Sequence, residues 1–159
     1  MIEDKYFEDY TVGDVVVSED FSISEQEVET YTKLVRVSHP IHLDKEFCRR
    51  QLGRPDLLVP GCLTLAFADA YWANLVTPAS PFSPHYGQDR VRYLGRLFCS
   101  EVIRCEFKLV DKRPKNDAYG MLTYETYVRK QSGDPILFEI DKVIVPYRNP
   151  HAGEGSQRV

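Results

Sequence analysis

The hydrophobic pattern of this chain changes from helical in its first half to strand-like in its second. Near the start, the Val- and Phe-rich residues 15–21 predict a strand. A stripe of apolar residues at helical spacing then follows the capping-box sequence SEQE at residues 24–27. We expect Pro40 to end this helix, because proline cannot continue a helical ladder. Asp44 is then expected to cap a short helix over residues 45–51.

Residues 61–76 are apolar on nearly every face, which predicts a helix buried on all sides. Pro60-Gly61 stands at its start, where backbone N–H groups lack partners within the helix and the dipole is positive. Strand-like runs follow, with a hairpin turn at Ser132-Gly133-Asp134; they lie at about residues 89–98, 101–110, 121–130 and 136–147. The sequence therefore predicts an α+β fold in which an antiparallel sheet wraps around the central apolar helix.

Composition indicates an ordinary globular protein. The chain has 159 residues, 43% of them hydrophobic and 28% charged, which suits one domain. We expect that domain to span residues 1–148, followed by a flexible tail over 149–159. No apolar run approaches the ~20 residues of a membrane span, and the start MIEDK does not resemble a signal peptide, so we expect a cytoplasmic protein. The net charge of −4 without a basic stripe argues against nucleic acid as a partner.

Cysteine and histidine spacing gives little sign of a metal or redox centre. The chain has four cysteines, and no two of them form a Cys-x-x-Cys pair. Side chains at residues 39, 42 and 44 could in principle hold a metal ion, but the next histidine, His85, is distant in sequence. We therefore expect no metal and no bound cofactor.

The stretch His39-Pro40-Ile41-His42-Leu43-Asp44 is the strongest candidate for catalysis. Imidazole has an unperturbed pKa of ~6.5, which suits proton transfer near neutral pH. Pro40 fixes its own φ and pushes His39 towards an extended conformation, so the loop has a defined shape. Taken alone, these residues leave open whether the histidines are catalytic or belong to an ordinary surface loop.

Several short motifs follow one another in a specific order. A capped helix precedes HPIHLD at 39–44, a short helix leads to LGRP at 52–55, and VPG at 59–61 opens the apolar helix. This order resembles the MaoC-like (R)-specific enoyl-CoA hydratase/dehydratase family, which has the hotdog fold. The resemblance continues through DRVRY at 89–93 and covers roughly residues 6–148. It implies a single hotdog domain.

The resemblance also implies an activity, the reversible hydration of a 2-enoyl thioester carried by coenzyme A or acyl carrier protein. In the family's motif, Asp-x-Asn-Pro-(Ile/Leu)-His, the catalytic histidine matches His42. Val37 stands in place of the motif's aspartate, and His39 in place of its asparagine. The acid/base role therefore falls to His42. The second catalytic group is open between His39, which ranks first, and Asp69 on the apolar helix.

Binding roles follow from the same resemblance. The amides of Gly61 and Cys62 suit the thioester oxygen, because developing enolate charge would meet N–H groups and a positive helix dipole. Arg90 and Arg92 share one face of their expected strand and could meet the phosphates of coenzyme A. Members of the family generally work as dimers with the active site between subunits, so we expect a homodimer or a dimer of dimers.

Two other functions remain open at this point. A hotdog acyl-CoA thioesterase would need a carboxylate base on or near the central helix, which Asp69 could supply. A catalytically silent acyl-thioester-binding protein would account for Val37 in place of the aspartate.

Overall fold

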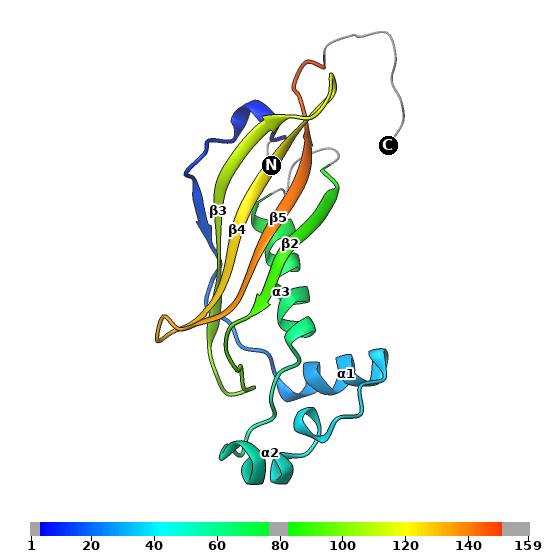
Figure 1. Ribbon diagram of the computed structural model, residues 1–159, viewed down its shortest axis with the longest axis vertical. Coiled ribbons are helices and arrows are strands. Elements are labelled where there is room, and N and C mark those ends of the chain that lie inside the picture. The colour runs from blue at the N-terminus through cyan, green and yellow to red at the C-terminus, as the bar shows by residue number, and fades with distance from the viewer. Residues whose placement is uncertain (1–3, 77–82, 151–159) are drawn as a thin grey trace.

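A five-stranded antiparallel sheet curves around one long helix, as seen in a computed structural model that describes residues 4–76 and 83–150 (Figure 1). The strands stand in the order β1-β3-β4-β5-β2; they are β1 (Val15–Val17), β2 (His85–Tyr93), β3 (Ile103–Pro114), β4 (Tyr119–Lys130) and β5 (Pro135–Pro146). The helices are α1 (Glu25–Val35), α2 (Lys45–Leu52) and α3 (Gly61–Leu75), with short 3-10 turns η1 (Phe7–Asp9) and η2 (Pro40–His42). The predicted α+β fold is confirmed. Within the described ranges, no helix is long and apolar enough to cross a membrane.

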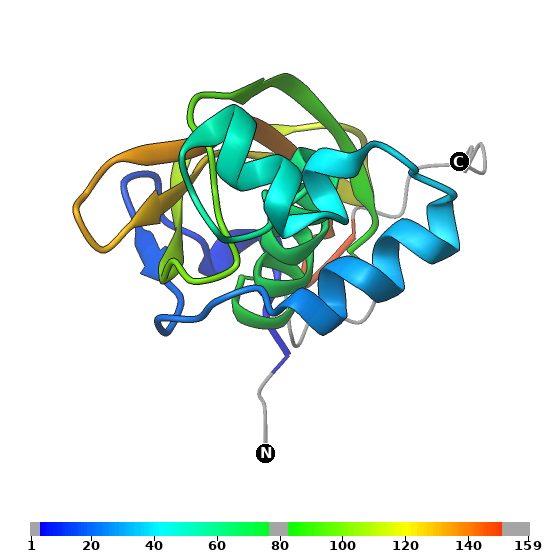
Figure 2. The same cartoon turned by 90° about the horizontal axis from the view of Figure 1, so that it is seen from below.

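Helix α3 runs lengthwise along one face of the sheet, and α1 and α2 lie at the end where it begins (Figures 1 and 2). Leu63 and Trp72 of α3 are buried in the core. Cys62, Ala66 and Ala73 are exposed, so the prediction that this helix is buried on all sides is wrong for the single chain. The reason is that the sheet covers only one side of α3.

The first helix begins as predicted but ends early. Ser24 Oγ accepts the Glu27 amide at 3.2 Å, and the Glu27 carboxylate accepts the Ser24 amide at 2.7 Å, which completes the capping box. The helix ends at Val35 because Arg36 adopts a left-handed conformation, with φ 62°. Pro40 therefore does not end this helix, and instead begins η2.

Strand β2 differs most from its prediction. It begins at His85 and ends at Tyr93, whereas the sequence predicted residues 89–98. It ends because the amides of residues 94 and 95 both donate to the Ile136 carbonyl, and the chain then turns away from the sheet. Strand β1 is also shorter than predicted. Most of the predicted tail, residues 151–159, lies outside the described residues.

Candidate active site

His42 lies at the end of η2, and its ring is held by one hydrogen bond. Its Nδ1 is 2.6 Å from the carbonyl oxygen of Leu58. A carbonyl oxygen can only accept a hydrogen bond, so Nδ1 carries the proton and Nε2 of the neutral ring has its lone pair free. His42 is therefore set up to take a proton at Nε2.

The backbone around His42 is tied to the segment that precedes α3. The Leu58 amide donates to the carbonyl of Ile41 at 3.2 Å, and the Cys48 thiol donates to the same carbonyl at 3.0 Å. Asp44 caps α2 as predicted, because its carboxylate accepts the amides of residues 46 and 47 at 2.8 and 3.0 Å. These contacts give the histidine loop a fixed position relative to Leu58.

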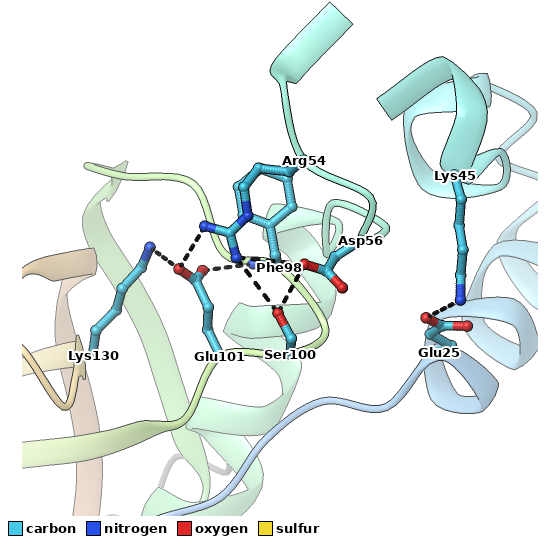
Figure 3. A network of polar contacts seen from close by, with 8 residues as sticks. All are labelled: Glu25, Lys45, Arg54, Asp56, Phe98, Ser100, Glu101 and Lys130. Carbon is cyan, nitrogen blue, oxygen red and sulfur yellow. Dashed lines mark hydrogen bonds and ion pairs between the residues drawn. The ribbon is translucent and has the colours of Figure 1, made fainter. Parts of the chain in front are cut away.

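A polar network anchors the segment between α2 and Leu58 to the sheet (Figure 3). The Arg54 guanidinium lies over the Phe98 ring, 4.6 Å from its centroid, and contacts Glu101 at 3.7 Å. Glu101 also pairs with Lys130 of β4 at 2.8 Å. Single exposed ion pairs contribute little to stability, but a connected network restricts the geometry of the chain. The LGRP motif thus helps to position the carbonyl that orients His42.

A pocket of ≈ 300 Å³ brings His42 together with the start of α3. Its lining includes His42, Gly61, Cys62, Thr64, Tyr93 and Arg96. Three residues predicted from the sequence, His42, Gly61 and Cys62, therefore share one cavity. Aspartate and glutamate are absent from its lining within the described part of the chain.

The first turn of α3 presents free backbone donors to this pocket. No side chain in residues 4–76 or 83–150 caps the helix, and its first backbone bonds run from the Leu63 and Thr64 amides to the Pro60 carbonyl, at 3.0 and 3.1 Å. The amides of Gly61 and Cys62 precede these bonds, so they have no carbonyl partner within the helix. Two adjacent N–H groups at a helix N-terminus can stabilise a developing oxyanion.

Tyr93, at the end of β2, covers the start of α3 and was not predicted as a site residue. A Cβ atom at position 61 would lie 2.8 Å from its ring, so Gly61 is what lets the ring approach the helix backbone. The Tyr93 hydroxyl lies 3.4 Å from the Cys62 sulfur. Burial, and then this contact, raise the pKa of Tyr93 to about 12, which keeps the phenol neutral at physiological pH.

His39 lies near His42 but outside the pocket lining. Its Nδ1 accepts the Ile41 amide at 3.3 Å, and the centroids of the two imidazole rings are 6.4 Å apart. The His39 side chain thereby caps η2 and is exposed. The structure gives His39 a role in shaping the loop.

Asp69, Arg90 and Arg92 also lie outside the pocket lining. Asp69 accepts the Gln88 amide at 2.6 Å, and burial, followed by the nearby Asp141 carboxylate, raises its pKa. Both arginines are exposed. The alternation of side chains between the two faces of β2 is interrupted between them, because Arg90 has φ 56° and lies at a register shift with β5. The arginine that lines the pocket is Arg96, in the turn after β2. No periodic pattern in the sequence marks Arg96 as a site residue.

Residues 9–86 match the family model of hydroxyacyl-thioester dehydratase type 2, Htd2. The matched range contains His42, Gly61 and Cys62, and stops near the start of β2. No curated protein matches the chain in sequence.

Solved structures share the whole fold. The (R)-hydratase PhaJ1 from Pseudomonas aeruginosa has 20% identity and a TM-score of 0.76, over 97% of this chain and 96% of that one. The MaoC-like dehydratase from Rhodospirillum rubrum has 19% identity and a TM-score of 0.77, over 91% and 99%. Rv0216 from Mycobacterium tuberculosis, described as a double hotdog fold, has 17% identity and a TM-score of 0.75, over 96% and 47%. Together with the Htd2 match, they confirm the predicted resemblance to MaoC-like hydratases and dehydratases, and they show that the chain has the hotdog fold.

Proposed function

We propose that this protein interconverts a 3-hydroxyacyl thioester and the corresponding 2-enoyl thioester, and is therefore a hydro-lyase. One observation carries the proposal: an oriented imidazole, His42, and the uncapped N-terminus of α3 line the same pocket. The match of residues 9–86 to hydroxyacyl-thioester dehydratases supports this class of reaction.

In the proposed dehydration, His42 Nε2 takes the proton from the α-carbon of the substrate. The electron pair moves towards the thioester oxygen, which the amides of Gly61 and Cys62 stabilise. The bond between the β-carbon and the hydroxyl oxygen then breaks, and the imidazolium returns its proton to the leaving hydroxyl, which departs as water. Hydration is the reverse. One histidine thus carries the proton in both directions, so the reaction does not require an aspartate at Val37.

The acyl group is carried by a coenzyme A or acyl-carrier-protein thioester. In either carrier a phosphate follows the thioester arm, and Arg96 lies in the pocket wall where it can meet such a charge. Arg90 and Arg92 lie on the exposed strand β2 and would serve a bound carrier only from outside this pocket.

The working form is proposed to be a homodimer joined through β2. This strand is at the edge of the sheet, so its outer backbone groups are free to pair with another strand. Tyr86 and Leu94, on and beside it, are 55% and 51% exposed. The double hotdog of Rv0216 supports a two-unit assembly. Light scattering should give twice the 18.4 kDa mass of the chain, and a monomer at micromolar concentration would contradict this assembly.

The test uses crotonyl-CoA and longer enoyl-CoA thioesters. A hydratase removes the conjugated thioester absorbance without releasing free thiol. Thiol release would instead identify a thioesterase; the position of Asp69 outside the pocket lining argues against that function. Binding without either signal would identify a silent acyl-thioester-binding protein. Val37 favours this as the second candidate, and so does a pocket lining that contains no carboxylate among the residues described by the structure.

A further inference from the structure

Three side chains that the proposed reaction does not use meet between α3 and the sheet. They are Asp69 from α3, His85 from the first position of β2 and Asp141 from β5. Each offers one nitrogen or oxygen atom, and these three atoms all lie within 4.8 Å of one another. His85 Nε2 lies 3.4 Å from Asp141 Oδ1.

Neighbouring residues hold all three side chains in place. The Thr126 hydroxyl donates to Asp141 Oδ2 at 2.5 Å, and the Gln88 amide donates to Asp69 Oδ1 at 2.6 Å. The indole of Trp72 packs against the His85 ring, with 5.5 Å between the centroids. Outer contacts of this kind orient the ligands of metal sites.

Among the described residues, two buried carboxylate oxygens in and beside this cluster accept no hydrogen bond, and one of them, Asp141 Oδ1, has only the His85 ring nitrogen near it, at 3.4 Å. Asp141 is 1% exposed and Glu139 is 0% exposed. Asp141 Oδ1 and Glu139 Oε1 accept no hydrogen bond within residues 4–76 and 83–150. Glu139 belongs to the same cluster, because the Gln88 amide that binds Asp69 also donates to Glu139 Oε2, at 2.8 Å. A buried carboxylate oxygen without a partner is costly, and such a group calls for a ligand.

The cluster also lacks a permanent positive charge. Across the described residues, no lysine or arginine forms an ion pair with Asp69, Glu139 or Asp141, and only His85 lies within ion-pair distance of one of them. Two or three carboxylates in one buried site without a fixed cation repel one another. A bound cation would remove this repulsion and would coordinate Asp141 Oδ1.

We propose that Asp69, His85 and Asp141 bind a divalent first-row transition metal ion, of which Zn²⁺ is the clearest case. At bond lengths of ~2.0–2.2 Å, neighbouring ligands of a tetrahedral zinc ion are ~3.4 Å apart, which is the separation between the His85 and Asp141 atoms. The Asp69 ligand atom lies within 4.8 Å of the other two. One imidazole with two carboxylates selects such an ion over Mg²⁺ or Ca²⁺. The His85 side chain is 36% exposed, which gives the ion a path to enter.

This metal site is separate from the pocket at the start of α3. Asp69 follows Gly61 by eight residues, which is ~12 Å along the helix. The ion would join the middle of α3 to β2 and β5, so its expected effect is on stability. This site could not be predicted from the sequence, because the three ligands are 16 and 56 residues apart and form no local motif.

The full chain is first treated with EDTA and dialysed. Calorimetry then measures the binding of Zn²⁺, and thermal unfolding measures the melting temperature with and without the ion. The metal-ligand variants are His85→Gln and Asp141→Asn. The controls are Asp111→Asn, an exposed carboxylate on β3, and His42→Gln, which tests whether zinc binds the pocket instead. Circular dichroism checks that each variant is folded. The His85 side chain is partly exposed, so we expect His85→Gln to fold. This variant can therefore test the site even if Asp141→Asn does not fold.

The proposal expects one Zn²⁺ per chain and a higher melting temperature with zinc than without. His85→Gln and Asp141→Asn should bind at least ~10-fold more weakly, while both controls bind as the wild type does. Mg²⁺ at the same concentration should leave the melting temperature unchanged. Three results would each overturn the proposal: no zinc binding by the wild type, unchanged affinity in the two ligand variants, or loss of binding in His42→Gln.

Discussion

Helix α3 carries two polar sites that differ in how the chain builds them. The pocket at its N-terminus combines His42, Leu58 and Gly61 from the first half of the chain with Tyr93 and Arg96 from the end of β2 and the turn after it. The acidic cluster at its middle is made from Asp69, His85, Glu139 and Asp141, which come from α3 and two strands. The first is an open site with free donors, and the second is a buried site with free acceptors. One helix can therefore serve a catalytic pocket and a separate cation site.

The largest expected effect on activity is the difference between substituting His42 and substituting His39. His42→Ala should lower kcat for enoyl-CoA hydration by ~10³-fold, because it removes the only proposed proton carrier. His39→Ala should keep activity close to wild type, since His39 is exposed and outside the pocket lining. Steady-state kinetics on both variants measure this. An equal loss in His39→Ala would make His39 the second catalytic group.

The acidic cluster should make stability fall as pH rises. Burial, followed by the Asp141 and Asp69 charges, raises the pKa of Glu139 from 4.5 to about 9. Between these values the folded chain holds a proton that the unfolded chain has released, so the free energy of unfolding of metal-free protein decreases from about pH 5 to pH 9. Urea unfolding across this range should show the decrease in the wild type and a flatter profile in Glu139→Gln.

The matched control for this titration is Glu106→Gln, on strand β3 of the same sheet. Its side chain is 37% exposed and lies 3.8 Å from Arg129, so the substitution should leave the slope with pH unchanged. A flat wild-type profile would mean that the cluster does not hold an extra proton in the folded state.

Tyr93 tests the geometry of the pocket wall. Tyr93→Ala removes the ring that lies against Gly61, and should raise KM by ~10-fold with a smaller change in kcat. Tyr93→Phe keeps the ring and should behave like the wild type. If Tyr93→Phe instead lost kcat as severely as His42→Ala, the phenol would be a proton donor in the reaction.

The smallest expected effect is a difference in thiol reactivity. Cys62 is exposed in the pocket, whereas burial raises the pKa of Cys105 to about 12. At pH 8, iodoacetamide should therefore label Cys62 and leave Cys105 unmodified, and a saturating acyl-CoA should slow the labelling of Cys62. Mass spectrometry of tryptic peptides reads both results. Labelling of Cys62 that is unaffected by acyl-CoA would place the thioester elsewhere.

The sequence predicted what depends on local patterns. The capping box at residues 24–27, the apolar run at 61–76 and the alternating strands are set by residues close to one another in sequence. Asp69 could not be placed in this way. Its position on the same helix as Gly61 suggested a shared site, but a helix rises ~1.5 Å per residue, which separates the two.

The end of β2 shows a second limit of prediction from local sequence patterns. A strand over 89–98 places Arg90 and Arg92 on one face, but the bulge between residues 89 and 92 and the turn at residue 94 depend on hydrogen bonds to β5. These long-range contacts bring Tyr93 and Arg96 to the pocket. No local sequence pattern predicts these contacts.

The stereochemistry of hydration in D₂O tests most directly whether His42 alone carries the proton, because one imidazole that serves both steps stays on one face of the substrate. The wild type should add deuterium at the α-carbon and hydroxyl at the β-carbon of crotonyl-CoA on the same face, as NMR of the product would show. His42→Ala should form product ~10³-fold more slowly. Addition on opposite faces would require a second catalytic group, and binding without any product would show that the pocket only holds the thioester.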